Sequence, residues 1–205
     1  AEALRSLTEK DLIHPSERAA INFAPSGETA YTFNHGLIRE VVYSAIPRTR
    51  RAHEHLRIAE WLPSLSREAP GQVVELLAQH YYRYYTLANL SRSRNQERRR
   101  QVRAQVVAAL QQAGEASVAR HALAKADSYY TDALELFGEE VDPSDAPLVV
   151  ALLSARGAAR WLALRADDAW NDYRDALRVW SATSAAIAPS GAVTAGASSE
   201  ARGVA

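Results

Sequence analysis

The chain has 205 residues, of which 47% are hydrophobic, so it can bury a core and is not a disordered chain throughout. Its 24 basic and 24 acidic residues cancel, which removes the overall attraction expected of a general nucleic-acid or membrane-surface binder. The absence of cysteine excludes disulfides and thiolate metal sites. With no long apolar run and no secretory leader, we expect a cytoplasmic protein without a membrane segment.

The first third of the chain is expected to combine a hairpin and two helices. Alternating apolar residues predict a β-hairpin over about residues 19–34, with Ile21 and Phe23 on one strand, Tyr31 and Phe33 on the other, and turn residues at 25–28. Helical spacing then continues on both sides of Pro47, with apolar stripes at Leu37, Ile38, Val41, Val42 and Ala45, and at Ala52, Leu56, Ala59 and Leu62.

This stretch resembles the end of the winged-helix domain in signal-transduction ATPases with numerous domains, the STAND group. The matching positions are Phe33, His35, Leu37, Ile38, Arg39, Glu40, Val41, Tyr43, Pro47, Arg48, Arg51, Glu54, Trp61 and Leu62. The resemblance implies that residues 1–62 are the C-terminal part of a winged-helix domain, so that the chain begins in mid-domain. The absence of methionine, even at position 1, also suggests a piece of a longer protein. The parent protein would bind ATP or ADP.

His35 is the sharpest candidate site residue. In related STAND proteins, a Met-His-Asp element ends the winged-helix domain, and its histidine reaches the β-phosphate of bound ADP. Asn34-His35-Gly36 resembles that element in position, with glycine in place of the aspartate. The resemblance implies a nucleotide-phosphate sensor in the parent protein, while the alternative is a histidine that caps or packs. No cofactor is expected in this fragment itself.

Residues 63–94 are expected to form a helical linker or a first helical pair, with a stripe at Val73, Leu77, His80, Tyr81, Tyr84 and Ala88. The segment Leu77–Tyr81 also resembles the start of helical repeats in the same family. A run of arginines follows within residues 92–103. It is interpreted as a solvated helix start, with contact to a partner or phosphate as the alternative.

An internal repeat occupies residues 95–184, as two units at about 98–138 and 146–182. A constant offset of 43 residues aligns Gly114, Ala126, Tyr130 and Ala133 with Gly157, Ala169, Tyr173 and Ala176. Glycine, small residues and an aromatic at these spacings are typical of the tetratricopeptide repeat, in which two antiparallel helices pack closely. The usual period is about 34 residues, so the excess is assigned to the connector at 138–147. Residues 185–205, rich in Ala, Ser and Gly, predict a disordered tail.

Other candidate sites have plainer explanations. His53 and His55 are two apart on a helix and point away from each other, which disfavours a metal site. His80 is expected to be a hydrogen-bonded core residue. The acidic residues of 167–175, Asp172 included, lie among arginines and are interpreted as solvated helix faces. The chain has no phosphate-binding loop and no nucleophile motif.

The predicted fold class is therefore mainly α: a partial winged helix with a small β-hairpin, followed by an antiparallel helical-hairpin solenoid of the tetratricopeptide kind. The predicted function is a non-catalytic regulatory and protein–protein interaction segment. It would relay nucleotide state to a cyclase or transcription-regulator domain, with a protein or neighbouring domains of the same chain as partner. The alternative is a fragment of a winged-helix DNA-binding transcriptional regulator. Nucleic acid is not the expected partner, because the net charge is zero.

Overall fold

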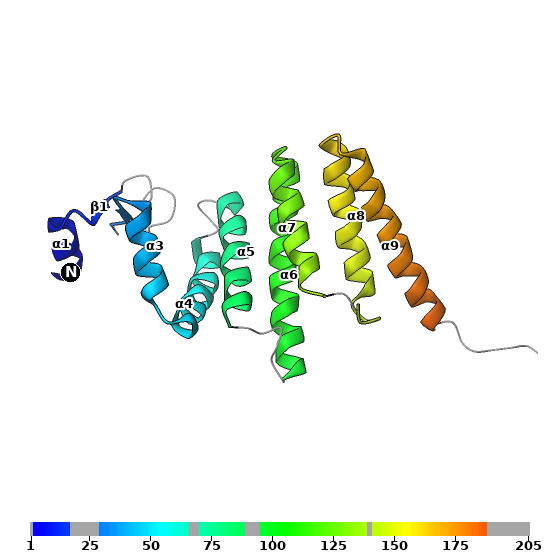
Figure 1. Cartoon of the computed structure of the whole chain (residues 1–205), viewed down its shortest axis with the longest axis horizontal. Helices are drawn as coiled ribbons and strands as arrows, with labels where there is room; N and C mark the ends of the chain where they lie inside the picture. Colours follow the sequence, from blue (N-terminus) through cyan, green and yellow to red (C-terminus); the bar gives the residue numbers. More distant parts are fainter. Residues whose placement is uncertain (1, 17–28, 66–69, 89–94, 139–140, 188–205) are drawn as a thin grey trace, which may run out of the picture.

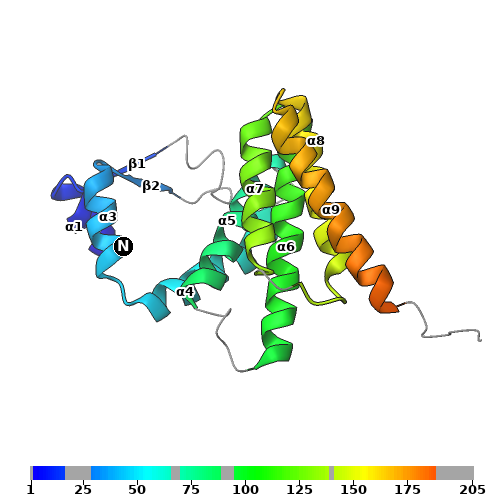
Figure 2. The same ribbon diagram turned by 45° about the vertical axis from the view of Figure 1, so that its right-hand side comes forward.

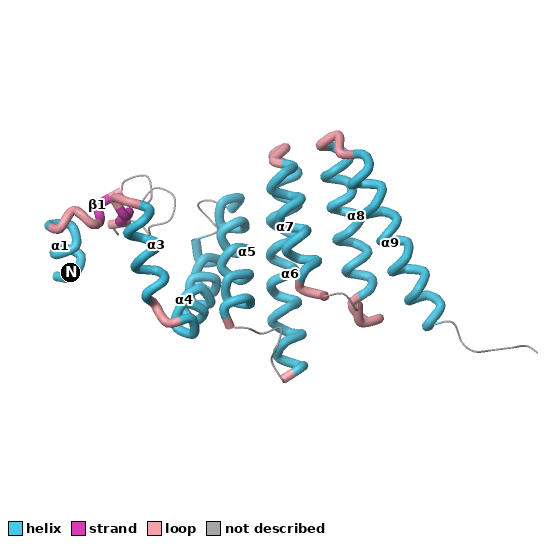
Figure 3. The backbone as a smooth tube through the Cα atoms, in the orientation of Figure 1, coloured by secondary structure: helices cyan, strands magenta, loops and turns pink. Residues whose placement is uncertain are grey.

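The computed structural model describes residues 2–16, 29–65, 70–88, 95–138 and 141–187. Over these ranges the chain is mainly helical, with eight α-helices and a two-stranded antiparallel sheet. The mainly helical fold class is confirmed. Helices α5 to α9 stand side by side in a row (Figure 1), and the small sheet lies near the N-terminal end (Figure 3).

The N-terminal part comprises α1 (Glu2–Glu9), β1 (Ile13–Pro15), β2 (Tyr31–Phe33) and α3 (Gly36–Ala45). β1 pairs antiparallel with β2, placing Ile13 opposite Phe33. The expected strand at Ile21 and Phe23 and the expected turn at 25–28 lie outside the described residues. β1 was missed by the sequence patterns because three residues that include a proline show no alternation.

Asn34 ties the end of β2 to the turn after α1. Its side-chain amide donates to the main-chain carbonyl of Asp11 at 2.8 Å and to the Asp11 carboxylate at 2.6 Å. Its main-chain N–H donates to the carbonyl of Leu12 at 3.1 Å. Its side-chain oxygen also contacts the ring of His14. One side chain thereby fixes the backbone immediately before His35.

The apolar stripe of α3 is exposed rather than buried. Leu37 is 77% exposed, and Val41 and Val42 are also exposed. The helix packs on β2, and it lies to one side of the helical row, together with α1 and the sheet (Figure 2).

The first pair of the row is α4 (Arg48–Trp61) and α5 (Pro70–Leu87), joined in part by a short 3₁₀ turn, Leu62–Leu65. The expected stripe of α4 is turned inward, with Ala52, Ala59 and Leu62 buried. Arg48 donates to the carbonyls of Thr86 and Leu87, both at 2.8 Å. A cation at a helix C-terminus satisfies carbonyls that have no partner within the helix, so Arg48 stabilises the end of α5.

Two helical hairpins follow: α6 (Gln96–Ala119) with α7 (Leu123–Glu135), and α8 (Ala146–Leu162) with α9 (Ala166–Ile187). Asn95 begins α6 by accepting the main-chain N–H of Arg98 at 3.0 Å. α6 packs on α5 and α7, and α8 packs on α7 and α9, so one core runs through the row. α9 continues two residues beyond Ala185, where the tail was expected to begin, and the rest of that tail lies outside the described residues.

Each hairpin closes around a glycine and a tyrosine 16 residues apart. A Cβ atom on Gly114 would lie 2.6 Å from Cε1 of Tyr130, and one on Gly157 would lie 3.0 Å from Cε1 of Tyr173. The seam alanines Ala126, Ala133, Ala169 and Ala176 are all buried. The two tyrosines differ in their surroundings, because Tyr130 is 2% exposed and Tyr173 is 36% exposed.

This difference predicts unequal costs for the same substitution. Gly114→Ala should lower the free energy of unfolding by about 1 to 3 kcal/mol, because the new methyl group meets a ring enclosed on all sides. Gly157→Ala should change it by less than about 1 kcal/mol, since the ring of Tyr173 can move toward solvent and alanine favours the helix. Urea denaturation of both variants measures the difference. Equal losses would contradict the explanation.

Candidate functional site

In the described part of the chain, a groove of about 630 Å³ lies between α4, α5, α6 and α7. Most of the side chains that line it can form hydrogen bonds or carry charge. Its lining residues are Arg39 from α3, His55 from α4, Gln79, His80, Tyr82 and Arg83 from α5, Leu110 from α6, and Lys125, Ser128, Tyr129 and Asp132 from α7.

A line of hydrogen bonds runs through one end of this groove. Nδ1 of His55 lies 2.9 Å from Nδ1 of His80, and Nε2 of His55 lies 2.9 Å from the hydroxyl of Tyr43 on α3. A hydrogen bond between two Nδ1 atoms needs one of them without a proton, so the contact requires at least one neutral ring. The guanidinium of Arg51 lies 4.9 Å above the ring of Tyr43 and supports its position.

Burial and the neighbouring charges keep this pair neutral. Burial, followed by the charge of His55, lowers the pKa of His80 to about 4. Burial, followed by the charges of Arg83 and Arg51, lowers the pKa of His55. His80 was expected to be a hydrogen-bonded core residue: it does contact His55, but it is only partly buried and lines the groove. The contact between the two histidines was not foreseen, because they are 25 residues apart on different helices.

The parts of the groove formed by α5 and α7 also carry phenols and one carboxyl group. Tyr82 donates its hydroxyl to Glu135 at 3.3 Å, and burial, followed by Asp132 and Glu135, raises the pKa of Tyr82 to about 12. Burial and then Glu135 also raise the pKa of Asp132, while Arg83 opposes the rise. The groove is therefore lined by the cations Arg39, Arg83 and Lys125 and by Asp132, a carboxyl group that binds its proton more tightly than usual.

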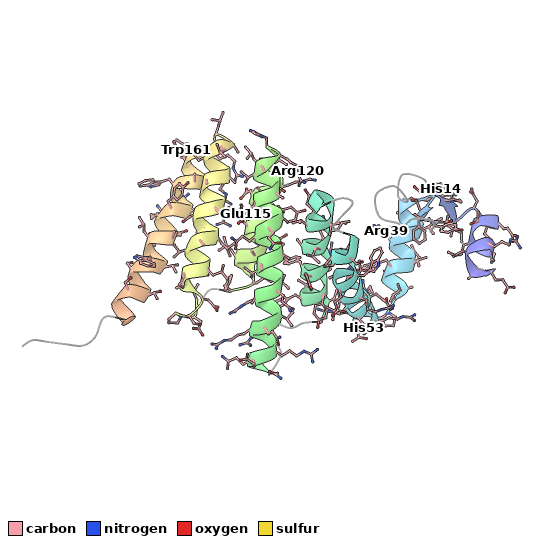
Figure 4. All side chains as sticks on the ribbon, turned by 180° about the vertical axis from the view of Figure 1, so that it is seen from behind. His14, Arg39, His53, Glu115, Arg120 and Trp161 are labelled. Atoms are coloured by element: carbon pink, nitrogen blue, oxygen red, sulfur yellow. The ribbon has the colours of Figure 1, made fainter. Side chains whose placement is uncertain are left out.

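Glu75 joins the groove wall to the neighbouring turn. Its carboxylate accepts from Arg120 and, at 3.4 Å, from Lys125. Figure 4 shows Glu115 on α6 and Arg120 just after its end, away from Arg39 on α3 and His53 on α4. His53 is exposed and does not line the groove.

His35 lies outside the groove, at the N-terminus of α3. It is exposed, and its main-chain carbonyl accepts the N–H groups of Ile38 at 3.1 Å and Arg39 at 3.3 Å. Its side chain makes no capping hydrogen bond. The capping alternative is therefore not supported by the side chain, and the phosphate-sensing role stays a prediction.

The arginine run is partly paired with the connector between α7 and α8. Arg100 binds Asp142 at 2.6 Å, and Arg103 binds Asp145 while its guanidinium lies 4.8 Å above the ring of Phe137. Hydrogen bonds from Ser144, followed by Arg100, lower the pKa of Asp142. Arg92 and Arg94 lie outside the described residues. The expected solvated helix start therefore holds only in part, because Arg100 is exposed whereas Arg103 is largely buried in its pair with Asp145.

Asp172 corrects one of our expectations. It is 2% exposed rather than solvated, and its carboxylate accepts from Arg156 at 2.7 Å and Arg160 at 2.9 Å. Arg160 also binds Asp127 on α7 at 2.8 Å, so these charges join α7, α8 and α9. The offset of 43 residues relates Asp172 to Tyr129, and the structure buries both side chains.

No family model, curated protein or solved structure gives a significant match to the chain. In the described ranges, no helix has the length and apolar character needed to cross a membrane. The same ranges contain no cluster of three or more His, Asp or Glu residues suited to a metal ion.

The neutral histidine pair predicts a loss of stability in mild acid. His80 has a folded pKa of about 4 and a usual value of 6.5, so the unfolded chain takes up the proton first as the pH falls. The contribution of neutral His80 to the free energy of unfolding is present above pH 6.5 and is lost as the pH falls toward 4. After allowance for partial exposure, we expect a loss on the order of 1 to 2 kcal/mol.

Urea denaturation at a series of pH values tests this contribution. His80→Gln should reduce the fall in the free energy of unfolding between pH 6.5 and 4. His53→Gln, on the exposed side of α4, should leave that fall unchanged. An unaltered slope in His80→Gln would contradict the assignment.

The Asp172 cluster predicts a large and specific loss of stability. Asp172→Ala leaves Arg156 and Arg160 without their shared carboxylate. The substitution should lower the free energy of unfolding by about 3 to 5 kcal/mol. Asp175→Ala removes only an exposed contact with Arg178 and should cost less than about 1 kcal/mol. Thermal unfolding monitored by circular dichroism compares the two. Similar losses would show that the buried cluster does not stabilise the hairpin.

Proposed function

We propose that this chain is a non-catalytic regulatory and protein-interaction segment, which binds a polypeptide partner in the groove between α4 and α7. One observation carries the proposal. Hydrogen-bonding and charged side chains from α3, α4, α5 and α7 line the same space of about 630 Å³. A helical array with a polar groove suits an extended segment of another protein better than a small apolar ligand.

The repeated packing of the two hairpins supports a tetratricopeptide-like array. Gly114 and Gly157 meet Tyr130 and Tyr173 at the same spacing, and the seam alanines are buried in both units. Arrays of this kind stack units side by side and use the resulting surface for binding. The preceding α4 and α5 form a third antiparallel pair, which extends the array and supplies the histidine wall of the groove.

The charges of the groove favour a partner that carries carboxylates. Arg39, Arg83 and Lys125 line the groove together with Asp132, whose pKa is raised. An acidic segment would pair with the three cations, while the phenols of Tyr82 and Tyr129 offer hydrogen bonds. Such a contact gains specificity and association rate more than raw affinity.

The resemblance of residues 33–62 to a winged-helix end supports the wider role. In that role the groove belongs to a multidomain signal-transduction ATPase and relays nucleotide state in the parent protein to an output domain. ATP or ADP would bind elsewhere in that protein, with His35 as a phosphate sensor. In the short α1, Arg5 accompanies Glu2 and Glu9, and Lys10 follows the helix, so this part gives no specific support to DNA binding.

Selection from displayed random peptides tests the groove. The intact chain should enrich acidic peptides, and Arg83→Glu combined with Lys125→Glu should reduce their affinity at least about 10-fold through charge reversal. Arg57→Glu combined with Arg178→Glu reverses two exposed cations outside the groove and should have little effect.

Two outcomes would count against the proposal. Enrichment without acidic character, or equal losses in both double variants, would contradict the groove as the binding site. Tight binding of duplex DNA at moderate salt, measured by fluorescence anisotropy, would favour the transcription-regulator alternative instead.

A further inference from the structure

An apolar stripe lies exposed along α9 at the C-terminal end of the helical row. Trp170 and Leu177 are each 69% exposed, Trp180 is 57% exposed, and Tyr173 is 36% exposed. Their spacing of three, four and three residues places all four on one side of the helix. Trp161 is also exposed, and Figure 4 shows it at the adjacent end of the α8–α9 hairpin.

In the first hairpin, a neighbouring helix packs on the positions that correspond to this stripe. The offset of 43 residues relates the stripe to Asp127, Tyr130 and Leu134 on α7 and to Phe137 just after it. There, Tyr130 and Phe137 are buried in the core cluster that contains Val149 and Leu152 of α8, with Leu134 packed against it. Asp127 binds Arg160 of α8. In the first unit, therefore, the next helix of the row covers this seam.

The second unit has a different chemistry at one position of the seam. Trp170 stands where Asp127 binds an arginine in the first unit, so the stripe on α9 is entirely apolar or aromatic. A helix that covers it needs apolar side chains along its full length, rather than the arginines that α8 presents. α9 itself carries such side chains.

The four residues of the stripe are spaced symmetrically about position 175 of the sequence. Trp170 and Trp180 lie at equal distances from Asp175, and so, in sequence, do Tyr173 and Leu177. If two α9 helices pack antiparallel about a twofold axis level with Asp175, Trp170 faces Trp180 of the second copy and Tyr173 faces Leu177 of the second copy. Self-complementary contact of this kind is what a twofold interface requires.

We infer that the stripe on α9 is a self-association surface, occupied by α9 of a second copy of this chain in an antiparallel homodimer. Aromatic side chains bury roughly 150 to 250 Å² each, so the two stripes together would remove on the order of 1,000 Å² from water. That area is at the low end for specific interfaces, which predicts a weak dimer with a dissociation constant in the micromolar range. The inference does not depend on the proposed function of the groove.

Sedimentation velocity of the intact chain, from low micromolar to a few hundred micromolar, tests this directly. We expect a concentration-dependent dimer that Leu177→Glu weakens at least about 10-fold, because the substitution places a charge in an apolar contact. Leu37→Glu is the matched control, an equally exposed leucine on α3, and should not change the dimer. Circular dichroism should show both variants folded, since neither side chain is buried.

Cross-linking tests the antiparallel register. The chain has no cysteine, so a substitution introduces a single thiol. Arg174→Cys lies beside the stripe and next to the proposed axis, and should form an intermolecular disulfide readily under mild oxidation. Arg57→Cys, exposed on α4, should form much less.

Three results would overturn the inference. They are a monomer at every concentration, a dimer disrupted by Leu37→Glu but not by Leu177→Glu, and equal cross-linking of the two thiols. The first would mean that the stripe is covered by something other than a second copy. The other two would place self-association on a different surface.

Discussion

Close contact between a helix backbone and a tyrosine ring is the constraint on which the helical row depends. In each hairpin a glycine allows the ring to lie against the partner helix, and buried alanines keep the two backbones near one another along the same seam. The glycine and the tyrosine that it contacts lie within the same hairpin. The same pair can therefore recur 43 residues later, and the two glycines need not contact each other.

The outer surfaces of the hairpins are joined by different means. Apolar residues unite α5, α6, α7 and α8 in one core, while a buried group of opposite charges links α7, α8 and α9. Buried charges require partners at defined distances, so they fix orientation more strictly than aliphatic contacts do. The second hairpin is thus held in one position against the first by the pairing of Arg160 with both Asp127 and Asp172.

The sequence predicts local features better than distant ones. Helix positions, the glycine–tyrosine spacing and the inward stripe of α4 follow from short-range periodicity, and the structure has them where they were expected. The strand Ile13–Pro15 is too short to show a period. The contact of His55 with His80 and the burial of Asp172 depend on how separate helices meet, which residue spacing within one helix does not reveal. The charged lining of the groove also depends on how separate helices meet, and no pattern in the sequence predicts it.

The bond from Tyr43 to His55 has a mechanical consequence. α3 and α4 are separated by Ile46 and Pro47 alone, and Tyr43 near the end of α3 reaches across to the second turn of α4. Pro47 is a stiff pivot, because its φ angle is fixed by its ring. Tilting the N-terminal part about this pivot would pull the phenol from His55 and release the imidazole that holds His80. A displacement of the sheet would therefore change the hydrogen bonding of His55 and His80 inside the row, without unfolding of α5.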